Sequence, residues 1–232
     1  MGPDLTTAAA LARAVETIDE SHTFQDTLDA IVEATRTSLP AFGHVSISMR
    51  HSDGTMETKA GTDQLAWELD TFQYELGEGP CVDAVESQPV IVAKHLRHDQ
   101  RWPRYVASAV EKGVRSQVAV RLFANGKHTG GLNLYSTQHD DIDDEAAETA
   151  LLFATHAGVM LGHAEHTDQL NQALLGRKTI GQAIGILMER YQMDEDRAFQ
   201  FLVRASSTSN LKVRDVAHEL VVSSVESYRT RA

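Results

Sequence analysis

The chain has 232 residues, of which 42% are apolar, enough for one large domain or two small ones, and no run approaches the roughly 18 apolar residues of a membrane span. Cys81 is the only cysteine, which excludes an internal disulfide and a zinc-finger module. The N-terminus carries acids and lacks the basic and then apolar regions of a secretory signal, so we expect a cytoplasmic protein with no membrane partner. The net charge of −12 argues at first sight against a nucleic-acid partner, but the charge is unevenly divided. Residues 1–168 hold 12 Lys and Arg against 26 Asp and Glu, whereas residues 169–232 hold 9 Lys and Arg against 7 Asp and Glu. The two parts are therefore expected to meet different partners.

The first part of the chain changes from helical to strand periodicity at Pro40. Apolar residues recur at helical spacing in the segment from Leu5 to Leu39, and the proline ends the predicted helix. Residues 44–49 (HVSISM) and 55–60 (TMETKA) then alternate between apolar and polar side chains, as half-buried strands do. The Asp-Gly pair at 53–54 is a hairpin signal, so we predict two antiparallel strands here.

Short helices and strands follow as far as residue 136. We predict a helix at 65–76, a turn at 77–81, a buried strand at 89–93, a helix at 102–113 closed by Gly113, and strands at 116–123 and 130–136. Together with the preceding hairpin, these elements describe an α+β domain with one antiparallel sheet, which we place at residues 1–145.

An acidic run, Asp140 to Glu145, precedes a long stretch of helical periodicity. A calcium-binding loop is one interpretation, but the glycine and the ligand spacing of such a loop are missing. Carboxylates at a helix N-terminus interact favourably with the helix dipole. We therefore interpret the run as the beginning of a helix.

A heptad pattern extends along this helix and predicts a coiled-coil linker at residues 146–175. The seam consists of residues spaced alternately by four and three: Phe153, Ala157, Met160, Ala164, Thr167, Asn171 and Leu174. Asn171 falls on an a position, where a buried amide favours a parallel homodimer in register. The alternative is a single helix that packs on its own domain, because several seam residues are small or polar.

After Gly176 we predict an all-α bundle of three short helices at residues 176–232. The first helix covers about 178–191, the second begins at the acids of DEDRAF, and the third follows NLKVRD. Gly181 and Gly185 lie one turn apart on the first helix, although each glycine in a helix interior costs about 1 kcal/mol relative to alanine. Two explanations stay open: close packing of another helix, or close approach of an RNA backbone or base.

This tail resembles the ANTAR domain family over the segment ALLGRKTIGQAIGILMERYQMDEDRAFQFLVRASSTSNLKVRDVAHELV. The residues that match the family pattern are Arg177, Ile180, Ala183, Gly185, Leu187, Met188, Ala198, Phe199, Leu202, Ser206 or Ser207, Asn210, Leu211, Asp215, Val216 and Ala217. The resemblance implies an RNA-binding transcription antiterminator that recognises small stem-loops near terminators and works as a dimer. One departure is Ile184, where many members have lysine.

The first 165 residues resemble a GAF sensory domain, as found fused to ANTAR in many bacterial regulators. The segments LGEGPCVDAV, RWPRY, GVRSQVAVRLF and GGLNLYS carry this likeness. It implies a pocket lined partly by the strands at 116–123 and 130–136, in which a small-molecule ligand would bind. The acid and Lys/Phe signature of cyclic-nucleotide-binding GAF domains is absent, so the ligand is not identified.

The candidate RNA-contacting residues combine cations, hydrogen-bond donors and the two helix glycines. They are Arg177, Lys178, Gly181, Gln182, Gly185, Arg204, Ser207, Asn210 and Lys212. The family resemblance directly supports Arg177, Asn210 and one of the serines. The other residues are chosen because the unstacked bases and phosphates of RNA loops need basic and amide donors. We expect structured RNA, and not DNA, as the partner.

Other chemistry finds little support in the sequence. The 11 histidines form no HExxH motif, and those of the linker are interpreted as solvated or interfacial, so we predict no metal site. We interpret Cys81 as a packed thiol and not as a redox sensor, and the GEGP segment before it lacks the Lys-Ser/Thr of a P-loop. No Ser/His/Asp arrangement or paired carboxylate setting stands out, so we predict no enzyme activity and no catalytic residues.

Two functions from different classes remain. The first is a sensor-coupled RNA-binding antitermination regulator that binds stem-loop RNA as a dimer. The second is a small-molecule sensor that acts through protein contacts, with a helical tail that only dimerises. Binding of structured RNA by the basic tail distinguishes the two.

Overall fold

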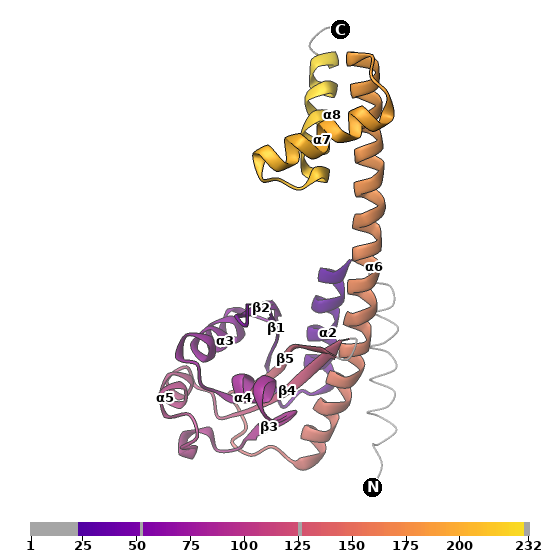
Figure 1. Cartoon of the computed structure of the whole chain (residues 1–232). Coiled ribbons are helices and arrows are strands. Elements are labelled where there is room, and N and C mark those ends of the chain that lie inside the picture. Colours follow the sequence, from indigo (N-terminus) through magenta and orange to yellow (C-terminus); the bar gives the residue numbers. More distant parts are fainter. Residues whose placement is uncertain (1–22, 52, 125–126, 230–232) are drawn as a thin grey trace. The chain divides into compact units, whose positions relative to one another are not determined.

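The computed structural model describes residues 23–51, 53–124 and 127–229, and the chain divides into two compact units, Met1–Glu165 and His166–Ala232 (Figure 1). Within the described residues, the predicted N-terminal helix is α2, Phe24–Ser38; the earlier part of that prediction lies outside the described residues. Thr23 begins α2 with a capping box, because its side chain accepts from the backbone of Asp26 while the Asp26 side chain accepts from the backbone of Thr23.

The remaining elements of the first unit follow the predicted order. They are β1 (His44–Arg50), β2 (Met56–Gly61), α3 (Gln64–Leu76), α4 (Pro80–Glu86), β3 (Val90–Ala93), η1 (Leu96–His98), α5 (Pro103–Glu111), β4 (Ser116–Ala124) and β5 (Lys127–Ser136). The hairpin predicted at the Asp-Gly pair is confirmed, since Gly54 N donates to His51 O at 3.0 Å. The helix α4 is missing from the sequence prediction, because Gly79 and Pro80 are typical of a turn, whereas proline also fits the first turn of a helix.

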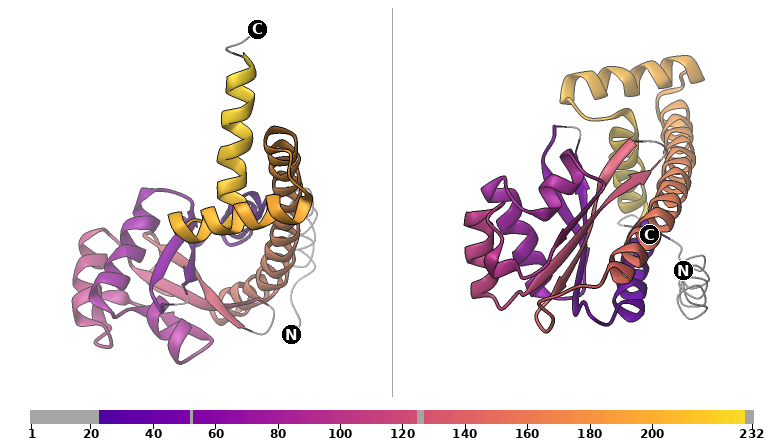
Figure 2. Two further views of the ribbon diagram at one scale, coloured as in Figure 1. Left: turned by 45° about the horizontal axis from the view of Figure 1, so that its top comes forward. Right: turned by 90° about the horizontal axis from the view of Figure 1, so that it is seen from below.

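The five strands form one antiparallel sheet in the order β2-β1-β5-β4-β3. Alternation along the strands sorts the side chains into two faces. One face is apolar, with Val45 and Ile47 from β1, Val118 and Val120 from β4 and Leu132 from β5 in a common core with α2 and the first turns of α6. The other face is covered by α3, α4 and α5 (Figures 1 and 2). The predicted α+β domain is thus confirmed as a sheet between two helical layers.

One helix, α6, runs without a break over Asp144–Tyr191, and this corrects the prediction of a new helix after Gly176. A glycine costs a helix about 1 kcal/mol but keeps its backbone N–H donor, and no proline follows it here. The predicted domain boundaries at 145 and 175 therefore fall within a single helix. The acidic run begins this helix as expected, because Asp143 Oδ1 accepts from Ala146 N at 2.7 Å.

The second unit contains the end of α6 together with α7 (Glu195–Ser209) and α8 (Val213–Arg229). Buried Ala183, Leu187, Ala198, Leu202 and Ala217 form its small core. A Cβ added at Gly176 would lie 3.9 Å from the Cβ of Arg214, and Arg190 donates to Ser224 Oγ at 3.4 Å. Consequently α8 lies alongside the end of α6 and runs in the same direction. The helix α7, which connects the two in the chain, crosses their direction (Figures 1 and 2).

Among the residues that the structure describes, no helix combines the length and the apolar composition that would let it cross a membrane.

Candidate functional site

The second unit exposes every side chain proposed to contact RNA. The exposed residues are Arg177, Lys178 and Gln182 on α6, Arg204 and Ser207 on α7, and Asn210 and Lys212 in the turn before α8. Within the described part of the chain, Arg204 Nε donates to a backbone acceptor, Gln200 O at 3.3 Å, and Ser207 Oγ donates to Val203 O at 3.0 Å. The cationic head groups are therefore accessible to a partner.

Charge is unevenly distributed in this unit. Residues 170–182 and 203–216 together hold five Lys and Arg and a single acid, whereas residues 183–202 hold two Arg and four acids. Because the start of α8 lies beside α6 at Gly176, the two cation-rich segments meet at one end of the unit. We call this end the cationic end; its exposed cations are Arg177, Lys178, Lys212 and Arg214. An end of this kind attracts phosphate groups.

The two glycines of α6 face open space. A Cβ added at Gly181 or at Gly185 would meet no heavy atom within 4 Å, apart from the helix's own backbone, in the part of the chain that the structure describes. Close packing of another helix of this chain therefore does not explain either glycine. Ile184, the departure from the family pattern, is half-buried against the core of the unit.

Asn210 has a structural role that the sequence did not reveal. It ends α7 in the left-handed conformation, with φ 56°, and its backbone N–H donates to Ser206 O. The Ser206 hydroxyl in turn donates to Leu211 O at 2.5 Å, which secures the turn into α8. Asparagine adopts left-handed φ more readily than most residues, so this requirement alone accounts for an Asn at the position.

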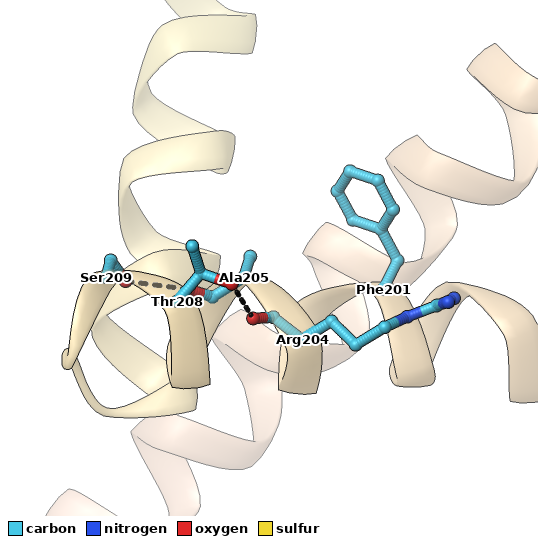
Figure 3. A pocket seen from close by; sticks show the side chains of 5 residues that line it. All are labelled: Phe201, Arg204, Ala205, Thr208 and Ser209. Carbon is cyan, nitrogen blue, oxygen red and sulfur yellow. Dashed lines mark hydrogen bonds between the residues drawn. The ribbon is translucent and has the colours of Figure 1, made fainter.

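An exposed aromatic pair was also not predicted from the sequence. The rings of Tyr191, at the end of α6, and Phe201, on α7, stack with centroids 6.3 Å apart and planes inclined by 26°. Phe201 also borders an open hollow of about 620 Å³ along α7, shown in Figure 3. Helical spacing in the sequence does not predict this pairing, because the two rings come from different helices.

The first unit contains a buried polar cluster between the sheet and α3. Thr58 Oγ1 and Asn133 Nδ2 donate to the Asp70 carboxylate at 2.7 and 3.0 Å, and the Tyr135 hydroxyl donates to it as well. Gln73 Nε2 donates to the same tyrosine oxygen at 2.9 Å. No Lys or Arg pairs with Asp70 among the described residues. The carboxyl group thus depends on neutral donors for its stabilisation.

Burial controls the acid–base behaviour of this cluster. Burial raises the pKa of the Asp70 carboxyl above its ordinary value, against the opposing effect of the hydrogen bonds that it accepts. Cys81 adjoins the cluster, since its backbone N–H donates to Gln73 Oε1 at 2.8 Å, and burial, with a smaller contribution from Asp70, raises the pKa of its thiol to about 12. Because the thiolate is the reactive form, a thiol that stays protonated at neutral pH is a poor redox sensor.

Comparison with known proteins decides the family. A GAF-domain profile matches residues 21–162, and an ANTAR-domain profile matches residues 168–221. The chain belongs to the GAF-ANTAR family. Its two domains make it a sensor-coupled regulator. No curated protein matches the chain.

Solved structures resemble the fold of this GAF-ANTAR protein at low sequence identity. The GAF domain of an Acinetobacter phosphoenolpyruvate-protein phosphotransferase aligns with a TM-score of 0.56 and 15% identity, covering 72% of this chain and 99% of that one. The photosensory core module of a Stigmatella aurantiaca phytochrome aligns with a TM-score of 0.58 and 12% identity, covering 84% of this chain and 43% of that one. These likenesses establish the fold alone.

The predicted dimer seam divides into two parts in the GAF-ANTAR structure. Phe153 and Ala157 are buried in the core of the GAF domain, and Met160 packs against that core, so these side chains are occupied within one chain. Ala164 is half-buried, and the remaining seam residues Thr167, Asn171 and Leu174 are exposed. In the first part of the seam, the helix therefore packs on its own domain, which was the alternative to a coiled coil. Dimerisation through the second, exposed part of the seam stays a prediction.

Metal ligation is not predicted from the sequence, and the described residues contain no group of three His, Cys, Asp or Glu side chains placed to hold a metal ion.

Proposed function

We propose that this GAF-ANTAR protein is a transcription antitermination regulator that binds stem-loop RNA through the cationic end of its ANTAR domain. In this proposal it acts as a homodimer, and a signal received by its GAF domain controls the binding. One observation carries the proposal: in a chain of net charge −12, two segments that together hold five cations and a single acid meet at one end of a small exposed unit. Phosphates are the common partners of such a surface. The proposal assigns no chemical reaction to the protein.

The composition of this end favours RNA loops over a uniform duplex. Gln182 adds amide hydrogen-bonding groups beside the cations, and Gly181 and Gly185 leave backbone accessible on the same helix. Unpaired loop nucleotides offer splayed bases and phosphates that can use such groups, whereas the bases of a duplex are stacked inside it.

The experiment is filter binding of the full chain to RNA hairpins with a constant stem and a randomised loop, at two salt concentrations, with a DNA hairpin of the same sequence in parallel. Lys212→Gln should weaken binding to all loops and reduce the slope of log K against log salt by about one. Arg104→Gln, an exposed cation on α5 of the GAF domain, is the matched control and should leave the slope unchanged. Absence of hairpin binding by the wild type would favour the sensor that acts through protein contacts.

For the signal, we propose that the polar cluster of the GAF domain is the region that responds. Asn133 Oδ1 of this cluster is buried without a hydrogen-bond partner among the described residues, as is Nε2 of Gln117, whose Oε1 accepts from the buried Tyr105 hydroxyl at 2.6 Å. Buried polar atoms without partners are costly, so a polar ligand that reaches them gains hydrogen bonds that the free domain lacks. This proposal is supported if Asn133→Leu abolishes the effect of a ligand that co-purifies with the protein.

A further inference from the structure

The stacked aromatic pair of the ANTAR domain, Tyr191 and Phe201, is largely exposed to solvent. Tyr191 and Phe201 are 56% and 45% exposed, although each ring contacts the other. Aromatic rings contribute most to stability when they are buried, so an exposed pair of rings is the kind of surface that a bound partner would cover.

The hollow beside Phe201 leads from this pair toward the cationic end. Its lining, shown in Figure 3, consists of Phe201, Arg204, Ala205, Thr208 and Ser209. These residues extend along α7 for about 12 Å, given a rise of about 1.5 Å per residue. The hydroxyls of Thr208 and Ser209 donate to the carbonyl oxygens of Arg204 and Ala205, so both hydroxyl protons are already used within the helix.

Arg204 places a positive charge in the same hollow. Its side chain extends along α7 to the level of Phe201 (Figure 3), and among the described residues it has no carboxylate partner. Its guanidinium is therefore available for a phosphate or for the edge of a base. Arg197, one turn before Phe201, is exposed but pairs with Asp194, its Nε lying 3.6 Å from Asp194 Oδ2, so Arg204 is the cation that the hollow can use.

We propose that this hollow binds an unpaired nucleotide of an RNA loop, whose base stacks on the ring of Phe201 while Arg204 and the cationic end hold the neighbouring phosphates. The inference rests on the RNA-binding function proposed above and names the residues that distinguish a loop from a duplex. An aromatic ring with an adjacent guanidinium is the combination on which unpaired bases stack, and a paired base inside a stem has no free face to offer. The stacked contact with Tyr191 holds the ring of Phe201 in place.

The charge of the hollow favours RNA over a second copy of this chain. A second copy carries the same net charge of −12 but presents its own cationic end at a symmetric contact, so the cations would face each other. An RNA loop carries one negative charge per nucleotide and meets no such repulsion.

The test separates the aromatic face of Phe201 from its apolar area. Phe201→Leu keeps an apolar side chain but removes the ring, whereas Phe201→Trp retains a ring for stacking. The probe is a hairpin RNA with a constant stem and a randomised loop, together with a fully paired duplex of the same stem. We expect Phe201→Leu to weaken hairpin binding by roughly 5- to 150-fold, the range that corresponds to one stacked base, and Phe201→Trp to restore it. Duplex binding and the sedimentation mass should be the same in all three proteins.

The outcomes distinguish this inference from the function on which it rests. Wild-type affinity of Phe201→Leu for the hairpin, with RNA binding by the wild type intact, overturns the stacking site and leaves the RNA-binding function standing. Loss of the dimer mass in Phe201→Leu assigns the hollow to a protein contact and also overturns the site. If the wild type binds neither hairpin nor duplex, both proposals fail together. A Tyr191→Leu variant, which leaves Phe201 in place, should weaken hairpin binding less than Phe201→Leu does.

Discussion

The hydroxyl of Tyr135 on β5 donates a hydrogen bond to the carboxylate of Asp70 on α3, although 65 residues separate them in the chain. Both side chains are completely buried. The contact fixes α3 against the sheet and keeps an ionisable group away from water, among neutral hydrogen-bond donors. Burial then raises the pKa of this carboxyl above that of the unfolded chain.

This pKa shift predicts a pH dependence of stability. The folded state holds the proton of Asp70 more tightly than the unfolded state does. This proton therefore makes its full contribution to the free energy of unfolding below the unfolded pKa of about 3.9, and that contribution is lost as the pH rises through the folded pKa. Asp70→Asn does not titrate and can still accept from Tyr135. We therefore expect wild type to lose stability relative to Asp70→Asn as the pH rises above about 4, measured by urea unfolding. A constant difference between the two proteins from there to neutral pH would contradict the prediction.

The open surroundings of Gly181 predict that alanine is stabilising there. The added Cβ meets no neighbour, and alanine favours the helix by about 1 kcal/mol relative to glycine. Gly181→Ala should therefore raise the free energy of unfolding of the ANTAR domain by roughly this amount. Gly130→Ala is the control, because its Cβ would overlap the backbone oxygen of Ser48 and should destabilise the GAF domain.

A larger residue at the same position should separate folding from RNA binding. We expect Gly181→Leu to keep native circular dichroism and native dimer mass but to bind hairpin RNA more weakly, because the side chain obstructs the surface that the glycine leaves open. Unfolding of the ANTAR domain in this variant would instead show that the glycine is needed for the fold.

The exposed part of the heptad seam predicts a dimer that a single charge can weaken. Leu174 is 62% exposed and lies on the seam, so Leu174→Glu should place like charges opposite each other in a parallel homodimer and lower the sedimentation mass. Ala173→Glu, which adds the same charge at an exposed position outside the seam, should keep the mass. An unchanged mass for Leu174→Glu places the dimer contact elsewhere.

Local sequence pattern by itself determines much of this protein. The alternation in residues 44–49 identifies β1 because every second side chain of a strand faces the same layer, and the Asp-Gly pair identifies the hairpin because few residues tolerate that turn. The motif of the tail identifies the ANTAR domain, and the local excess of Lys and Arg supports the proposal that this part meets a negatively charged partner.

Only the tertiary structure decided which distant residues meet. The continuity of α6 through Gly176 depends on many helical hydrogen bonds that together outweigh one unfavourable residue. The pairing of Tyr191 with Phe201, the gathering of cations from α6 and the start of α8, and the burial of Asp70 each require elements to pack in one particular arrangement. Periodicity specifies which face of an element is buried, but it does not specify the partner of that face, because the same apolar stripe can pack against many others.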